Sequence, residues 1–177
     1  MKLEPRISAP AFKADVFENV LLYIVERCAD KPSVGKTVLN KLLYFCDFNF
    51  YELYEEQLTG ASYRKMQYGP VPQELEITIE KLTAKGLIAT TENTNNGFRQ
   101  TRYLPLGESS AARLSKLEKS VIDDVISQMG DWTAREISDY SHGDIPWIAT
   151  NEKAEIEYNL AFYRNSPYSV RTYKDEL

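Results

Sequence analysis

The stretch from Thr37 to Tyr54, TVLNKLLYFCDFNFYELY, limits the possible folds of this chain more than any other segment. Stepped at about 100° per residue, it has one mostly aliphatic side and a nearly opposite aromatic side. The first side holds Leu39, Leu42, Leu43, Cys46, Phe50 and Leu53, and the second holds Tyr44, Phe48 and Tyr51. A helix that is apolar on both sides must be covered on both sides. We therefore expect a central helix, with other helices over its aliphatic side and the following segment over its aromatic side.

The flanking sequence predicts a mainly α-helical fold with a small β-hairpin or sheet, an α+β class. Further helices are expected at 10–29, 72–85, 110–129, 133–140 and 151–163, and strands at 87–92 and 98–104. A short extended segment is expected at 62–68, and Asn96-Gly97 is the expected turn between the two strands. Thr59-Gly60 is expected to cap the central helix, and Ser110 to cap the helix that it begins.

No linker or internal repeat divides the chain, so residues 1–177 are expected to form one compact helical domain. The ends, 1–9 and 165–177, are expected to be flexible. No stretch approaches the roughly 18 to 20 uninterrupted apolar residues of a membrane-spanning helix. The N-terminal residues MKLEPRISAPAF lack the apolar core of a signal peptide. We expect a cytoplasmic protein that makes no membrane contact.

Helix, turn, helix and hairpin in succession, from the central helix to residue 104, are typical of a winged helix. The helix that would enter the major groove carries Glu74, Glu76 and Glu80 against Lys81 and Lys85. The formal net charge of -5 also opposes a large phosphate-binding surface. DNA binding is therefore a disfavoured alternative, because winged-helix shapes also serve protein contacts.

Few residues could support catalysis. His142 is the only histidine, which excludes a two-histidine metal site, and Cys28 and Cys46 lie on expected buried helix faces. Asp139, His142 and Asp144 could form an acid–base or metal cluster, but no phosphate loop or nucleophile motif accompanies them. A capped loop with solvated aspartates is the favoured interpretation. We expect no enzyme, no metal and no cofactor.

Three short strings carry a family resemblance. They are KLLYF at Lys41–Phe45, YGPV at Tyr68–Val71, and Ser141-His142 followed by Trp147. In this order and spacing they resemble the Panacea domain, also called the SocA-like antitoxin domain, over most of the chain. The resemblance implies a mainly helical fold with a small β-element, found in bacteria and their phages, that acts in toxin–antitoxin pairs.

Members of that family neutralise unrelated toxins encoded beside them by binding them directly, and one type delivers its toxin to the ClpXP protease. Many also carry a separate DNA-binding domain, for which this chain has no room. The resemblance thus implies an antitoxin that binds a cognate toxin protein. An adaptor for ClpXP and a winged-helix transcriptional regulator are the alternatives.

The motif residues are expected to be mostly structural: Tyr44, Tyr68, Gly69, Pro70, Val71, His142 and Trp147. Gly69 permits an unusual backbone angle and Pro70 prevents further strand pairing, so YGPV is expected to form a turn that Tyr68 and Val71 fix in the core. His142 is expected to satisfy buried backbone groups, and Trp147 to close one end of the core.

The composition includes 12 tyrosines, more than core packing requires, and tyrosine suits protein interfaces. Candidate partner-binding residues are those where aromatic and charged residues meet. They are Tyr51, Tyr54, Tyr63 and Arg64 near the end of the central helix, and Phe98, Arg99, Arg102 and Tyr103 on the hairpin. An acidic chain of this kind is suited to a basic toxin.

Overall fold

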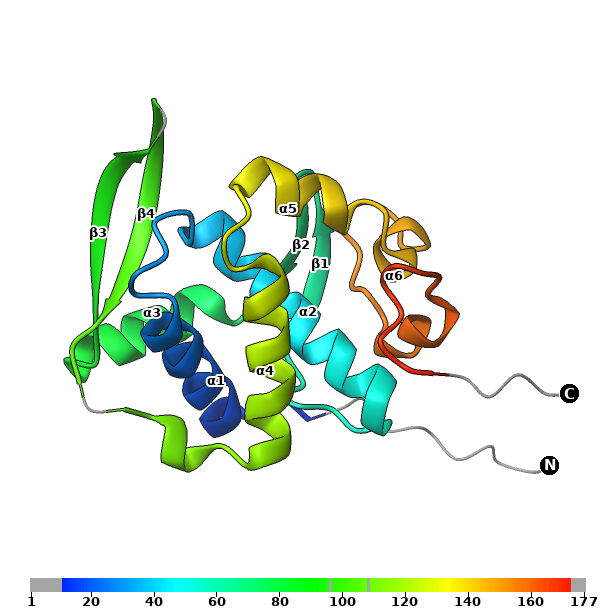
Figure 1. Ribbon diagram of the computed structural model, residues 1–177, viewed down its shortest axis with the longest axis horizontal. Helices are drawn as coiled ribbons and strands as arrows, with labels where there is room; N and C mark the ends of the chain where they lie inside the picture. Colours follow the sequence, from blue (N-terminus) through cyan, green and yellow to red (C-terminus); the bar gives the residue numbers. More distant parts are fainter. Residues whose placement is uncertain (1–10, 96, 108, 173–177) are drawn as a thin grey trace, which may run out of the picture.

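The computed structural model describes residues 11–95, 97–107 and 109–172 (Figure 1). The helices are α1 (Ala14–Arg27), α2 (Lys36–Tyr54), α3 (Leu75–Ala84), α4 (Lys116–Met129), α5 (Ala134–Ser141) and α6 (Ile145–Ile148), with 3₁₀ helices η1 (Ala111–Arg113) and η2 (Tyr158–Tyr163). The strands are β1 (Tyr63–Met66), β2 (Gly69–Pro72), β3 (Ile88–Asn95) and β4 (Phe98–Pro105). The predicted mainly helical α+β class is confirmed. In the described part of the chain, no helix is long and apolar enough to cross a membrane.

Helix α2 runs through the middle of the molecule and contacts α1, α4, α5, β2, β4 and η2 (Figure 1). Its buried residues include both the aliphatic and the aromatic sides predicted from the sequence. On the aromatic side, Phe48 stacks on Tyr158 of η2 with ring centroids 4.5 Å apart. Tyr63 of β1 meets Tyr44 and Phe48 edge-on. The aromatic side is therefore covered by the following strand, as expected, and also by a segment about a hundred residues later.

Two separate two-stranded antiparallel sheets complete the fold. β1 pairs with β2 beside α2 and α5, and its short turn lies between Met66 and Gly69. β3 pairs with β4 in a longer hairpin that extends away from the helices (Figure 1). Its base is held in the core by Ile88 and Tyr103, which are 1% and 8% exposed. The predicted order of helix, helix and hairpin is present, with the β1–β2 hairpin inserted between α2 and α3.

Several predicted boundaries are wrong. The cap of α2 is Glu55, in the left-handed conformation with φ 56, five residues before Gly60. YGPV is not a turn that stops pairing, because Gly69–Pro72 forms β2 and Pro70 lies opposite Lys65. A proline is tolerated here because a two-stranded sheet leaves one edge of each strand unpaired. Consequently α3 begins at Leu75 rather than at Pro72.

Helix α4 begins later than predicted. Ser110 precedes only η1, and Ser115 is the cap of α4. The Ser115 hydroxyl accepts a hydrogen bond from the Glu118 N–H, and the Glu118 carboxylate accepts one from the Ser115 N–H. Thr133 and Glu136 form the same capping box at α5, which confirms that prediction. Pro10 and Asn96, which were predicted to begin a helix and to form a turn, lie outside the described residues.

The helix predicted at 151–163 is largely absent, and only η2 forms there. The preceding segment instead runs beside β1. The Lys65 N–H donates to the Ala154 carbonyl at 3.0 Å, and the Ile156 N–H donates to the Tyr63 carbonyl at 2.7 Å. These bonds replace the intrahelical bonds that the sequence pattern favoured, so a tertiary contact overrides local helix preference.

Residues 165–172, which were expected to belong to a flexible end, also contact the core. The Ser169 hydroxyl donates to Glu52 at 2.6 Å, and the Val170 N–H donates to Glu52 at 3.1 Å. The Tyr168 hydroxyl donates to the Tyr140 carbonyl at 2.9 Å. This segment therefore lies over α2 and α5.

A fully buried charge network joins the C-terminal segment to α2. The Arg164 guanidinium donates to Asp144 at 2.7 and 2.9 Å, to Asn49 at 2.8 Å and to Glu52 at 3.4 Å. The side chains of Arg164, Asp144 and Glu52 are all 0% exposed. Burial alone lowers the pKa of Arg164, but the Asp144 carboxylate raises it overall, so the arginine stays charged.

We expect R164M to lower the free energy of unfolding by about 3 to 5 kcal/mol, because it leaves buried carboxylates without their counter-charge. R135M is the matched control. It removes an arginine from an exposed pair with Asp139, 3.9 Å apart, and should change stability by less than about 1 kcal/mol. Urea unfolding of both variants measures the difference, and equal effects would contradict the role given to Arg164.

Candidate functional site

The family motif residues gather where α2, β1, β2, α5 and α6 meet. Gly69 lies at the centre of this group, with φ 112, a backbone conformation that disfavours other residues. A Cβ atom at Gly69 would lie 2.4 Å from the Ser141 hydroxyl and 2.6 Å from Lys41 Cε. Glycine is therefore needed here for its backbone angle and because Lys41 occupies the space of a side chain.

Lys41 of α2 is buried, which is unusual for a lysine. It is 1% exposed, although it carries an amine. Burial lowers the pKa of Lys41 to about 8, and no carboxylate in the described part of the chain opposes this shift. A buried amine without a counter-charge is destabilising, and it is found chiefly at functional sites.

His142, directly after α5, stacks on Trp147 of α6 with ring centroids 4.4 Å apart. Lys65 Nζ lies over the Trp147 ring, 3.9 Å from its centroid. Within the described residues, the buried atoms His142 Nε2 and Trp147 Nε1 have no hydrogen-bond partner. His142 Nε2 therefore bonds no backbone group within the described residues. We name Lys41, Lys65, His142 and Trp147 the motif cluster.

The other motif residues differ in how deeply they are buried. The Tyr44 hydroxyl donates to Asp144 at 2.9 Å, and its ring is completely buried. Pro70 is buried and Val71 is half-buried. Tyr68, which was expected in the core, is 66% exposed, because the β1–β2 turn carries its side chain away from the helices.

The candidate binding residues near the end of α2 do not form one surface. Tyr63 is completely buried, and its hydroxyl donates to Asp47, so its assignment to a partner surface is wrong. Tyr51 is half-buried and packs on Tyr158 and Phe162. Tyr54 is 37% exposed, and exposed Arg64 donates to the Lys153 carbonyl at 3.1 Å. Of these four candidate residues, only Tyr54 and Arg64 are exposed.

The candidate binding residues on the β3–β4 hairpin also divide in two. Phe98 is 77% exposed and Arg99 is exposed beside Glu92, both near the tip. Tyr103 is buried at the base. Arg102 Nη2 donates to the carbonyls of Ala29 and Lys31 at 3.3 and 3.0 Å, just after α1. Assigning buried Tyr103 to a partner surface is therefore wrong, whereas Arg102 is half-buried and holds the hairpin to the body.

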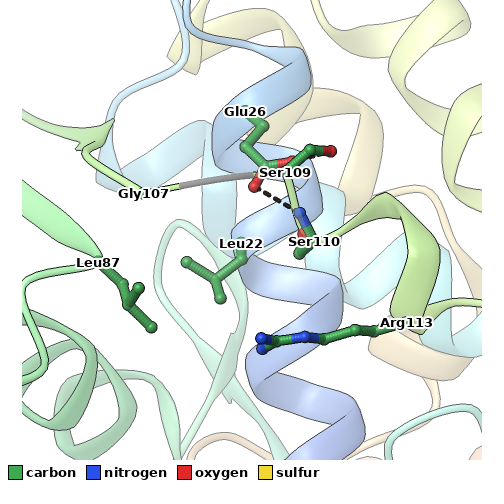
Figure 2. A pocket seen from close by; sticks show the side chains of 7 residues that line it. All are labelled: Leu22, Glu26, Leu87, Gly107, Ser109, Ser110 and Arg113. Atoms are coloured by element: carbon green, nitrogen blue, oxygen red, sulfur yellow. Dashed lines mark hydrogen bonds between the residues drawn. The ribbon is translucent and has the colours of Figure 1, made fainter.

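A pocket of about 270 Å³ lies between α1, the base of the hairpin and η1 (Figure 2). Its lining residues are Leu22, Glu26, Leu87, Gly107, Ser109, Ser110 and Arg113. The Glu26 carboxylate accepts a hydrogen bond from the Ser110 N–H at 2.9 Å, which closes one wall. This pocket shares no residue with the motif cluster.

The acidic residues near His142 do not form a common site. Asp144 is buried in the pair with Arg164, so it is not the solvated aspartate that was expected, whereas exposed Asp139 lies near Arg135. In the described part of the chain, no group of three histidine, cysteine or acidic residues could hold a metal ion.

Sequence reasoning missed Lys41 and Lys65 as members of the cluster. A signal for Lys41 was available, because it lies one helical turn before Tyr44 and Phe45, on a side of α2 expected to be buried. Lys65 had no comparable signal. Its position over Trp147 depends on the pairing of β1 with segments far away in the sequence.

We expect K41M to raise the free energy of unfolding at neutral pH by about 3 kcal/mol, because one pKa unit corresponds to about 1.4 kcal/mol. The pKa of Lys41 falls from 10.5 to about 8 on folding. Between these values the unfolded chain binds more protons, so this residue makes wild-type stability rise with pH. The gap between K41M and wild type should therefore narrow as pH rises through that window, as measured by urea unfolding. A destabilised K41M would contradict this account.

Comparison with known proteins identifies the family of this chain. A family model described as "Antitoxin SocA-like, Panacea domain" matches residues 39–148, more than half of the 177 residues. The matched range begins in α2 and ends in α6, so it contains every residue of the motif cluster. No curated protein and no solved structure gave a significant match. The family match supports a role related to toxin–antitoxin systems, and the chain belongs to the SocA-like antitoxin family with a Panacea domain.

Proposed function

We propose that this chain is an antitoxin that neutralises a cognate toxin by direct protein binding, and that the tip of the β3–β4 hairpin contacts the toxin. The observation that carries this proposal is Phe98, whose side chain is 77% exposed near the tip of a hairpin that extends from the body (Figure 1). Large exposed aromatic side chains are enriched at protein interfaces. The proposal assigns the chain a binding role and no catalytic step.

The hairpin holds Phe98 and Arg99 on a paired strand. Eight residue pairs join its strands, from Ile88 opposite Pro105 to Asn95 opposite Phe98. The base is buried through Ile88 and Tyr103, and Arg102 ties it to the end of α1. A contact at Phe98 and Arg99 would thus use residues whose backbone is already paired in the hairpin, which reduces the entropy cost of binding.

The charge of the chain supports a basic partner. A formal net charge of -5 favours long-range attraction to a basic toxin, such as one that acts on RNA or nucleotides. Arg99 lies beside Glu92, so the tip offers a paired charge rather than a cationic patch. An acidic chain that meets a basic toxin would associate faster at low ionic strength.

The ion pairs of α3 oppose the DNA-binding alternative. The two lysines near the end of α3, Lys81 and Lys85, both pair with the Glu18 carboxylate on α1. Glu76 on the same helix binds Lys36. The remaining alternative, delivery of the toxin to ClpXP, uses the same toxin contact and differs only in the fate of the complex.

The test co-expresses the neighbouring reading frame with wild type, F98A or I77A. Ile77 on α3 is 68% exposed and lies outside the hairpin, so I77A is a matched control. We expect wild type and I77A to restore growth, and F98A to bind the toxin about 30-fold more weakly or worse, as for an interface hot spot. Pull-down and calorimetry measure binding, and thermal unfolding should be the same for all three.

Two results would overturn the proposal: a harmless neighbour, or full rescue and binding by F98A. Repeating the rescue in cells that lack ClpXP separates the two forms of antitoxin action. Rescue that persists there supports direct blocking, whereas rescue that disappears supports delivery to the protease.

A further inference from the structure

We propose that the motif cluster is a binding site for a single carboxylate, supplied by an acidic side chain or the C-terminus of a partner protein. Its natural ligand rests on the proposed function, in which that partner is the toxin. The site is separate from the hairpin tip, because its residues lie in α2, β1 and α6 and directly after α5. The two would form independent contacts.

Lys41 has a buried amine beside Gly69. Gly69 lacks a side chain, and a Cβ atom there would lie 3.4 Å from Lys41 Nζ and 2.4 Å from the Ser141 hydroxyl. The Ser141 hydroxyl already donates to the Ser138 carbonyl at 2.7 Å. Among the described residues no carboxylate pairs with Lys41, so its positive charge calls for an external anion.

His142 and Trp147 each have one buried ring nitrogen without a partner within the described residues. Trp147 Nε1–H can only donate a hydrogen bond, and His142 Nε2 donates whenever it carries a proton. His142 follows Ser141, whose hydroxyl lies beside Gly69 as Lys41 does, and it stacks on Trp147. An ionised carboxylate only accepts hydrogen bonds, so it matches these donors.

The charges around the cluster favour an anion. Lys65 Nζ lies over the Trp147 ring, and its one ion pair within the described chain is to Glu152 at 3.8 Å, a side chain that is 72% exposed. Asp144, the nearest buried carboxylate in sequence, is already bound by Arg164 and Tyr44. Lys41 and Lys65 thus bring two positive charges to the cluster, and only Lys65 has a carboxylate beside it, in a chain that is acidic as a whole.

The surroundings suggest a protein as the source of the carboxylate. Tyr68, next to Gly69, is 66% exposed, and Ile148, next to Trp147, is 52% exposed. The donor atoms lie beneath half-buried rings, so a single side chain or chain end fits better than a phosphate backbone. Apolar residues around a buried polar contact are typical of interface hot spots.

The test uses N-acetylglutamate N-methylamide and N-acetylglycine as probes for the two carboxylate sources, with N-acetylglutamine N-methylamide as the neutral control. NMR follows the Trp147 indole and the single histidine of the chain, and Trp132 is an internal control. We expect saturable shifts at Trp147 and His142 with one or both acids, and none with the amide. The acid that binds more tightly identifies the source.

K41M should abolish these shifts, whereas K116M, which removes an exposed lysine from α4, should keep them. Thermal unfolding confirms that K41M is folded. In the toxin complex, K41M should weaken binding by about 30-fold or more, as expected for a lost buried charge pair. Absence of shifts with both acids, equal shifts with the amide, or an unchanged response in K41M would each overturn the site.

Failure of this proposal can be distinguished from failure of the proposed function. Acid-dependent shifts with no toxin binding would leave the carboxylate site intact and remove the toxin as its source. Toxin binding that F98A weakens, without any response to the acids, would keep the antitoxin role and reject the carboxylate site.

Discussion

The buried pairing of Arg164 with Asp144 and Glu52 joins α2, the start of α6 and the end of η2. Buried charges are unfavourable unless they are paired and hydrogen-bonded, and here one guanidinium pairs with both carboxylates. Asp144 in turn accepts from Tyr44, and Glu52 accepts from Ser169 and Val170. The network thus fixes the position of α6 and of the C-terminal segment against α2, and with them the position of Trp147.

The same region contains buried residues that differ in whether their polar groups are satisfied. Tyr44, Pro70 and Asp144 are buried with their polar groups satisfied, as expected for a scaffold. His142 Nε2 and Trp147 Nε1 are buried without a hydrogen-bond partner within the described chain, and buried Lys41 has no carboxylate partner there. Local breaches of the rule that buried polar groups are paired concentrate at functional sites. Residues of one family motif can therefore serve different purposes.

The sequence predicted what depends on local patterns. The two apolar sides of α2, the Thr133–Glu136 capping box and the β3–β4 hairpin all follow from spacing within a few residues. The Ser115–Glu118 box had an equally readable signal and was missed. The exposure of the candidate binding residues was predicted less well, because residue type does not reveal burial. Tyr63 and Tyr103 look like interface residues in sequence but lie inside the fold.

Features that depend on distant contacts could not be predicted. The segment before η2 lost its expected helix to hydrogen bonds with β1, about ninety residues earlier. No local pattern indicated that Arg164 would bind Asn49 and Glu52, which are 115 and 112 residues away. This separation affects the order of events during synthesis. When α2 emerges from the ribosome, the partner that neutralises Glu52 has not yet been made, so the central helix cannot be stably buried until almost the whole chain is available.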